Sequence, residues 1–256
     1  MTGQDGTPAR RRRSRLLLGA VSVAAGAALV AAGTAWWQGG GAPAATSAVV
    51  RPLPATGSPA ATTPDARSLA TALRQALART PMADFAYEGG LSQSDFYADA
   101  RGRLVHAPGG ADLAMTVTSP ASEGEPAEVT VRRGRPGEAR PGVADHARVI
   151  AVLASARTAA ELADATTGLT RTGDVYRGEV PAAGAPQHVQ HLLREIAGGW
   201  SEEELARSTL VWTVTLGERG LPARFAVEWR APIQGAVLTS SWTTAYSGWR
   251  AGTIAQ

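Results

Sequence analysis

Two of the four histidines have the spacing of metal ligands. His188 and His191 are three residues apart on a predicted helix, so both imidazoles lie on one helix face, a spacing that can bind Zn²⁺ or Cu²⁺. A stable site needs a third and a fourth ligand, and Glu195 is the only suggestive candidate nearby. We therefore predict no metal site and interpret the pair as exposed helix residues, whereas His106 and His146 lie in loop-like polar segments without a positioned partner.

Covalent catalysis finds little support in the residue types. The chain has no Cys, Lys or Asn, which excludes thiolate metal sites, disulfides and Schiff-base lysine chemistry. No Gly-x-Ser-x-Gly elbow is present, and Ser208 and Ser241 lie in or near predicted strands as ordinary polar residues. The glycine pairs at 89–90 and 109–110 lack phosphate-loop spacing. We expect neither an enzyme nor a bound cofactor.

Two charged clusters have alternative interpretations. Glu202, Glu203 and Glu204 could attract a cation, but Ser201 and Glu204 form a capping box at a helix start, which explains the acids by itself. A basic loop contains Arg132, Arg133, Arg135 and Arg140. Such a loop is typical of a solvated surface, and its alternative role is to bind an anionic headgroup or a cell-wall polymer.

The last fifty residues concentrate aromatic side chains on one face of predicted strands. Residues 210–216 and 225–229 alternate apolar and polar positions around the turn at 217–222, which predicts a hairpin, and a final strand follows over 237–246. The candidate ligand-lining residues are Trp212, Phe225, Val227, Trp229, Trp242 and Tyr246. Their face either packs under helices as ordinary core or lines an apolar groove, and the two interpretations are compatible.

The segments before this hairpin predict a mixed α+β domain. Apolar spacing predicts a helix of about 14 residues that starts at Asp65 and a second helix over 149–165. Two further helices are predicted at 187–196 and 201–208. Short alternating runs around 85–87, 96–105, 113–117 and 129–131 predict an antiparallel meander, and a further strand covers 174–180. Strands with one apolar face need a cover, which these helices can supply.

The N-terminal region predicts a membrane segment. Residues 16–37 contain no charge and are long enough to cross a bilayer, the arginine-rich tail 1–15 precedes them, and Trp36 and Trp37 suit the interface. We expect a single-pass protein with a cytoplasmic N-terminus, a linker at 38–65 and an extracellular domain at 66–256. The alternative is a cleaved signal sequence, with small residues near 42–44, and a secreted domain.

Charge is unevenly distributed along the chain. The formal net charge is +3, but five of the 25 arginines lie in the first fifteen residues with one acid. The remainder holds 20 arginines and 21 acids, so it is nearly neutral. A surface that follows nucleic-acid phosphates is therefore not expected.

The order of these features resembles a known group of proteins. Strands framing a helical insertion, the strand 175–180, the hairpin turn Gly220-Leu221-Pro222 and the closing segment 243–249 are similar to LppX/LprG-type lipoproteins of actinobacteria, over about 66–256. The resemblance implies a curved antiparallel half-barrel of the lipoprotein-carrier (LolA-like) fold with helices on its concave face. Several members of that group hold acylated lipids between sheet and helices. This chain lacks the lipobox cysteine, which leaves the membrane segment to substitute as an anchor.

Two functions follow as hypotheses. In the first, the domain is a membrane-tethered binding module of the cell envelope that takes lipid or acyl chains in an apolar groove. In the second, the same fold is a structural or regulatory ectodomain that binds an envelope protein. A continuous apolar cavity between sheet and helices supports the first hypothesis, whereas a filled interior supports the second.

Overall fold

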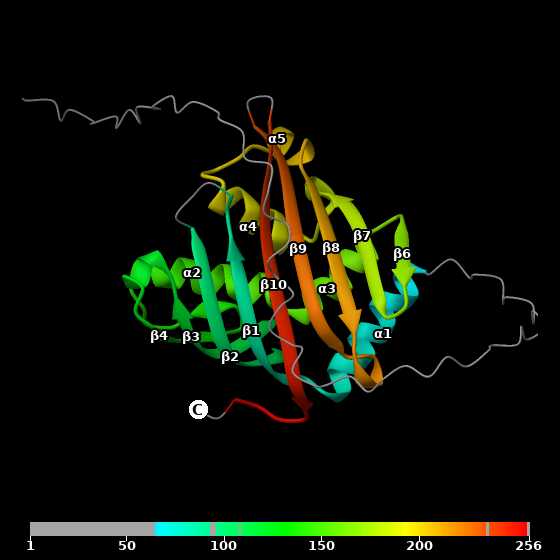
Figure 1. The fold of residues 1–256 in the computed structure, drawn as a ribbon, viewed down its shortest axis with the longest axis horizontal. Coiled ribbons are helices and arrows are strands. Elements are labelled where there is room, and N and C mark those ends of the chain that lie inside the picture. The colour runs from blue at the N-terminus through cyan, green and yellow to red at the C-terminus, as the bar shows by residue number, and fades with distance from the viewer. Residues whose placement is uncertain (1–64, 93–95, 108, 234–235, 255–256) are drawn as a thin grey trace, which may run out of the picture. The chain divides into compact units, whose positions relative to one another are not determined.

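A computed structural model describes residues 65–92, 96–107, 109–233 and 236–254 (Figure 1). All of them belong to one compact unit, Ser58–Gln256. The predicted tail 1–15 and membrane segment 16–37, and the predicted linker except for Asp65, lie outside the described residues. Within the described part, no helix is both long and apolar enough to span a bilayer.

Within the described residues, one antiparallel sheet of ten strands forms the framework, in the order β5-β4-β3-β2-β1-β10-β9-β8-β7-β6. Its first half contains β1 (Met82–Gly90), β2 (Tyr97–Ala107), β3 (Gly110–Thr118), β4 (Ala127–Arg132) and β5 (Arg135–Pro136). Its second half contains β6 (Leu169–Thr172), β7 (Val175–Pro181), β8 (Thr209–Leu216), β9 (Pro222–Ile233) and β10 (Ala236–Arg250). The first and last strands therefore pair at the centre of the sheet, which joins the two halves of the chain.

Five helices of the described residues accompany the sheet. They are α1 (Ala66–Arg79), α2 (Pro141–Leu153), α3 (Ala156–Ala165), α4 (Gln187–Ile196) and α5 (Glu202–Ala206), with short 3₁₀ turns at η1 (Pro120–Ser122), η2 (Ala182–Gly184) and η3 (Glu218–Gly220). In Figure 1, α1 to α4 all lie behind the sheet. The sheet is twisted, so that the direction of the strands rotates progressively from β10 to β4. We call the side of the sheet that carries the helices the helical face and the opposite side the outer face.

Helix α1 shows how closely the sequence signals match the local structure. Asp65 caps its start by accepting hydrogen bonds from the amides of Arg67 and Ser68, each at 3.1 Å. The helix ends at Arg79, because Thr80 precedes Pro81 and that position disfavours helical backbone. Its apolar stripe is buried and includes Leu69, Leu73, Ala76 and Leu77. The helix predicted from Asp65 is therefore confirmed.

The helix predicted over 149–165 is wrong in its extent. The structure has two helices instead, and the first starts at Pro141 inside a segment predicted as loop. Proline suits the first turn of a helix because its missing N–H has no partner there. The helix is interrupted at Ala154 and Ser155, between α2 and α3. The Thr158 hydroxyl bridges this break by donating to the carbonyl of Val152 at 2.7 Å. This break lets α2 lie over β3 and β4 while α3 packs against α1.

The core lies between the helical face and the helices. Side chains on β3 alternate strictly, so that Ala111, Leu113, Met115 and Val117 are buried while their neighbours are not. Alanines fill the buried side of α3, at Ala156, Ala159, Ala160 and Ala163. Such small residues allow the helices to approach each other and the sheet closely.

Candidate functional site

The six predicted ligand-lining residues lie on the helical face, on β8, β9 and β10. Their exposed fractions run from 0% for Trp212 to 7% for Tyr246, so all six are buried. They belong to one continuous core cluster with the helices. Five pockets formed by described residues have linings that include none of the six. Their contact with a ligand stays a prediction.

Two of the tryptophans hold the helical layer through paired hydrogen bonds. The Trp212 indole N–H donates to the Thr166 hydroxyl at 2.9 Å, and that hydroxyl donates to the carbonyl of Leu162 in α3 at 2.8 Å. The Trp229 indole N–H likewise donates to Ser208 at 2.9 Å, and Ser208 donates to Leu205 in α5 at 2.8 Å. Each hydroxyl thus connects an indole on the sheet to a helix end, which gives the buried indole the polar partner that it needs.

Tyr246 makes a third such connection, between β10 and the break that separates α2 from α3. Its hydroxyl donates to the carbonyl of Ala154 at 2.8 Å. Burial raises the pKa of Tyr246 far above its usual value, because the phenolate would lose its hydration. The tyrosine therefore stays protonated and remains a hydrogen-bond donor at any physiological pH.

Trp242 differs from these aromatic residues because its indole nitrogen is buried without a hydrogen-bond partner in the described part of the chain. Leaving such a donor unpaired costs about 1–3 kcal/mol. The residue pairs with Gly89 on the neighbouring β1. Sequence analysis identified Trp242 as a candidate, but the missing partner is a property of the packing alone.

A pocket of about 340 Å³ opens between the sheet and the helices, beside these aromatic residues. We call it the interior pocket. The end of β2, the start of β3, the β4–β5 turn and helices α2, α3 and α4 surround it. Its apolar lining includes Ala111, Ala151 and Val152, and its polar lining includes Ser155, Glu161 and His188. This volume lies at the lower end of the roughly 300–1,000 Å³ of small-molecule sites.

His106 connects the interior pocket to the aromatic cluster. Its Nδ1 lies 3.4 Å from the Ser155 hydroxyl, and its ring stacks on Trp249 with centroids 5.8 Å apart. Trp249 in turn lies 5.5 Å from the ring of Tyr246. The His106 Nε2 atom is buried without a partner in the described part of the chain. The sequence interpretation of His106 as an isolated loop residue was therefore wrong, since the residue ends a strand and contacts α3.

Burial sets the protonation state of His106. Desolvation, assisted by the nearby positive charge of Arg157, lowers the pKa of His106 to about 3. The imidazole is therefore neutral near pH 7, and it is too weak a base for proton transfer at that pH. His106 can act as a neutral wall of the pocket, as a donor or acceptor according to its tautomer.

His188 forms the opposite wall of the interior pocket. Its Nε2 lies 3.4 Å from Glu161, whose other oxygen accepts from the Arg157 Nε at 2.9 Å. Desolvation lowers the pKa of His188 more than the Glu161 charge raises it. In the described part of the chain, no group of three or more possible ligands gathers around a metal position. His188 and His191 are exposed residues of α4, as predicted, and the His188 side chain also lines the interior pocket.

His146 also differs from its sequence interpretation. It lies within α2, only 4% exposed, and its ring packs at 4.2 Å from that of Phe96. Burial lowers the pKa of His146, which favours the neutral form. His146 is therefore a core residue of α2, and its helix was missed because Pro141 and Gly142 suggested a loop.

The acidic cluster has the structural role that its sequence predicted. Ser201 accepts from the Glu204 amide at 3.2 Å, while its own amide donates to the Glu204 carboxylate at 2.8 Å. These bonds to Ser201 lower the pKa of Glu204. The capping box is thus confirmed. Ser208, which was interpreted as an ordinary polar residue, is buried and connects the Trp229 indole to the Leu205 carbonyl.

The basic segment predicted as one loop is divided between elements. Arg132 ends β4, Arg133 occupies the turn before β5 with a positive φ of 48°, and Arg135 begins β5. Arg140 occupies the N-cap position of α2 without a capping hydrogen bond from its side chain. The Asp112 carboxylate accepts from the Arg133 amide at 2.7 Å, which holds that turn. Arg133 also lines the interior pocket, so one of the four arginines reaches a site.

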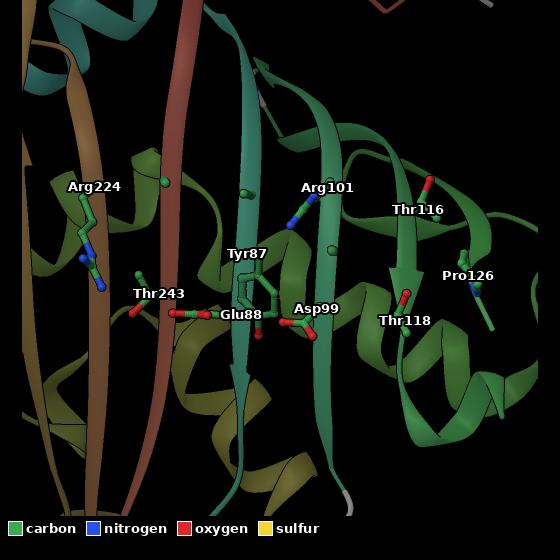
Figure 2. A pocket seen from close by; sticks show the side chains of 12 residues that line it. Tyr87, Glu88, Asp99, Arg101, Thr116, Thr118, Pro126, Arg224 and Thr243 are labelled. Atoms are coloured by element: carbon green, nitrogen blue, oxygen red, sulfur yellow. The ribbon is translucent and has the colours of Figure 1, made fainter. Parts of the chain in front are cut away.

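The outer face carries a second, larger concavity, which sequence analysis did not predict. Its volume is about 640 Å³, and we call it the outer hollow (Figure 2). Charged and hydroxyl side chains surround a floor of alanines; among them are Glu88, Asp99, Arg101, Arg224, Thr116 and Thr243. The sequence shows these residues at the polar positions of the predicted strands. It does not show which of them lie next to each other, because that depends on the order of the strands in the sheet.

Comparisons with known proteins find structural similarity only. The chain is similar to the crystal structure of LprF from Mycobacterium bovis, with 14% identity and a TM-score of 0.42, covering 75% of this chain and 97% of that one. It is also similar to the Mycobacterium tuberculosis lipoprotein LppX, with 10% identity, a TM-score of 0.41 and coverage of 73% and 96%. LppX is one of the proteins that name the group to which the sequence shows a resemblance. No family model and no curated protein matches the sequence.

Proposed function

We propose that the domain is a non-enzymatic binding module of the cell envelope that takes a lipid or acyl chain between its sheet and its helices. The interior pocket is the observation that carries this proposal. It lies between sheet and helices, and it combines an alanine and valine lining with a polar rim of Ser155, Glu161 and His188. An amphiphile has the same division, with an apolar chain and a polar end.

The α2–α3 break is the element that must move to admit a longer chain. Two polar contacts hold it on the sheet, from Tyr246 to the Ala154 carbonyl and between Ser155 and His106. Both contacts lie beside three rings that contact one another in turn, those of His106, Trp249 and Tyr246. These rings lead from the interior pocket toward the aromatic core. Loosening this break would connect the interior pocket with the buried aromatic face.

A membrane tether completes the proposal. Residues 16–37 are the proposed single span, with the tail 1–15 in the cytoplasm and the domain outside. The alternative is secretion after signal cleavage. N-terminal sequencing of the protein from its own host distinguishes the two, because a tethered protein keeps its arginine cluster.

The test is lipid retention by residues 58–256, which form one compact unit, expressed in the native host and analysed by native mass spectrometry. We expect a lipid adduct on the unmodified domain. Val152→Trp fills the interior pocket and should remove the adduct. Ala72→Trp places the same ring on the exposed side of α1 and should leave it unchanged. Absence of an adduct from every form, or its equal retention by both variants, would contradict the proposal.

A second candidate is a structural or regulatory ectodomain that binds an envelope protein. The observation in its favour is the filled aromatic interior, in which Trp212, Trp229 and Tyr246 all have hydrogen-bond partners. On this alternative, the domain keeps its interior closed at all times. Cross-linking in the native host would then capture a partner protein equally well with the unmodified chain and with Val152→Trp.

A further inference from the structure

The outer hollow lies on the face of the sheet opposite to the proposed lipid site, and the proposed function does not use it. Strand register arranges its side chains in two neighbouring rows. One row runs Arg101, Ala86, Ala245 and Arg224 across β2, β1, β10 and β9. The next row runs Asp99, Glu88 and Thr243 across β2, β1 and β10. The hollow therefore has a basic row and an acidic row side by side.

The basic row can converge on one anionic group. Three strand intervals separate Arg101 from Arg224, roughly 14 Å at the usual spacing, and the two residues between them are alanines. The long arginine side chains can therefore approach each other above a low floor. Figure 2 shows Arg101 pointing from β2 toward β1, with Arg224 on the far side of β10.

Two other arginines on the outer face have acidic partners. Arg230 pairs with Glu228, and Arg250 makes two hydrogen bonds to Asp84, at 2.8 and 3.0 Å. By contrast, Arg101 and Arg224 form no ion pair within the described part of the chain. Their guanidinium groups are thus available to a ligand.

The acidic row presents the complementary feature. Glu88 stands directly opposite Asp99 on paired strands, and like charges in that position destabilise a sheet. The hydroxyl of Tyr97 donates to Asp99 at 3.0 Å, but within the described residues neither carboxylate has a cationic partner. Figure 2 shows Glu88 extending from β1 toward Thr243, while Asp99 lies between β1 and β2. A cation seated here would relieve the repulsion.

We propose that the outer hollow binds a zwitterionic phosphoethanolamine group. The phosphate lies over Ala86 and Ala245, where the forked guanidinium groups of Arg101 and Arg224 can each donate two hydrogen bonds. The ammonium lies on Glu88 and Asp99. The two rows are two residues apart along the strands, about 7 Å, so a two-carbon spacer suits them. Free phosphoethanolamine and a phospholipid headgroup share this chemistry.

The first experiment titrates the full chain, in neutral maltoside micelles, with O-phosphoethanolamine by calorimetry. We expect saturable binding that Arg101→Gln and Arg224→Gln each weaken about tenfold, since each removes a charge-assisted pair. Arg103→Gln is the matched control, because it is exposed on the same face of β2 outside the hollow. A weakening of the same size in this control, or no saturable binding, would overturn the proposal. Unchanged melting temperatures show that all variants are folded.

The second experiment tests the acidic row by ligand selectivity. The unmodified chain should prefer O-phosphoethanolamine to inorganic phosphate and to phosphocholine, whose quaternary ammonium donates no hydrogen bonds. Glu88→Gln and Asp99→Asn should each remove much of this preference while phosphate binding persists or strengthens. An unchanged preference in both variants would contradict the assignment of the ammonium to this row.

The source of the ligand is decided by competition. Phosphatidylethanolamine mixed into the micelles displaces O-phosphoethanolamine if the hollow accepts a lipid headgroup, and it leaves binding unchanged if only the free compound fits. Both outcomes support the zwitterion site. The inference is also independent of the interior pocket, because Val152→Trp should leave binding to the outer hollow unchanged.

Discussion

The two faces of the sheet carry side chains that differ in size and polarity. The helical face carries the large aromatic residues of β8, β9 and β10, which are buried and mostly hydrogen-bonded to helix ends. The outer face carries alanine, threonine and charged residues on the same strands, and a hollow of about 640 Å³ lies among them. Size and polarity alternate along each strand, because consecutive side chains point to opposite faces.

Burial and available binding space are therefore separate properties of this domain. The aromatic residues that were predicted to line a groove are buried under the helices. The open concavities occur instead where side chains are short, at Ala111 and Ala151 on the inside and at Ala86 and Ala245 on the outside. Changes on the helical face should therefore alter stability most, and changes on the outer face should alter binding most.

The largest expected effect is on the helical face, at Trp229. Its side chain is 3% exposed, bonds Ser208 and packs at 5.1 Å against the ring of Trp200. Trp229→Ala should lower the free energy of unfolding by about 3–5 kcal/mol, through the cavity that it leaves and the lost hydrogen bond. Urea denaturation measures this loss. A much smaller loss, with a lipid-dependent change of tryptophan fluorescence in the unmodified domain, would show that the residue lines a groove rather than core.

A smaller effect is expected where an indole lies against a glycine. Gly178 on β7 pairs with Trp212, and an added Cβ would lie 2.5 Å from the indole ring. Gly178→Ala should therefore cost about 1–3 kcal/mol by overpacking. Gly168→Ala is the control, since nothing lies within 4 Å of its added Cβ. Equal thermal stability of the two variants would show that the indole can move away freely.

The third effect is a loss of stability at acidic pH, and it concerns His106, which lies between the aromatic residues and the interior pocket. The folded-state pKa of His106 is about 3, below the usual 6.5, so the unfolded chain takes up its proton first. This contribution to stability is present above about pH 6.5 and is lost as the pH falls toward about 3. His106→Gln should therefore lose less stability than the unmodified chain between about pH 7 and about pH 4.5. Parallel denaturation curves at both pH values would contradict the burial of this imidazole.

The smallest effect belongs to the outer face. Glu88 stands opposite Asp99, so Glu88→Gln should raise the free energy of unfolding by about 0.2–1 kcal/mol by removing a like-charge pair. High salt should reduce the gain, since it screens exposed charges. Thr243→Val changes the other neighbour of Glu88 without altering charge and is the control. A loss of stability in Glu88→Gln would mean that the carboxylate is compensated in the folded chain.

Local signals in the sequence were sufficient for much of the architecture. Asp65, Thr80 and Pro81 defined both ends of α1, Ser201 and Glu204 defined the start of α5, and the alternation around the turn at 217–222 predicted the β8–β9 hairpin. These features depend on residues close together in the chain. They also correctly placed the six aromatic and aliphatic candidates on a shared, buried face.

Most element types, the apolar faces and the expectation of an α+β domain follow from the sequence, because hydrophobic periodicity and capping act over a few residues. The tertiary structure, by contrast, sets the pairing of β1 with β10, which brings Ala86 beside Ala245 and places Arg101 and Arg224 on either side of them. It also decided that α2 starts at Pro141 and that His106 meets Ser155. Such contacts join segments 49 to about 160 residues apart, and their free energy comes from packing and desolvation that no local pattern records.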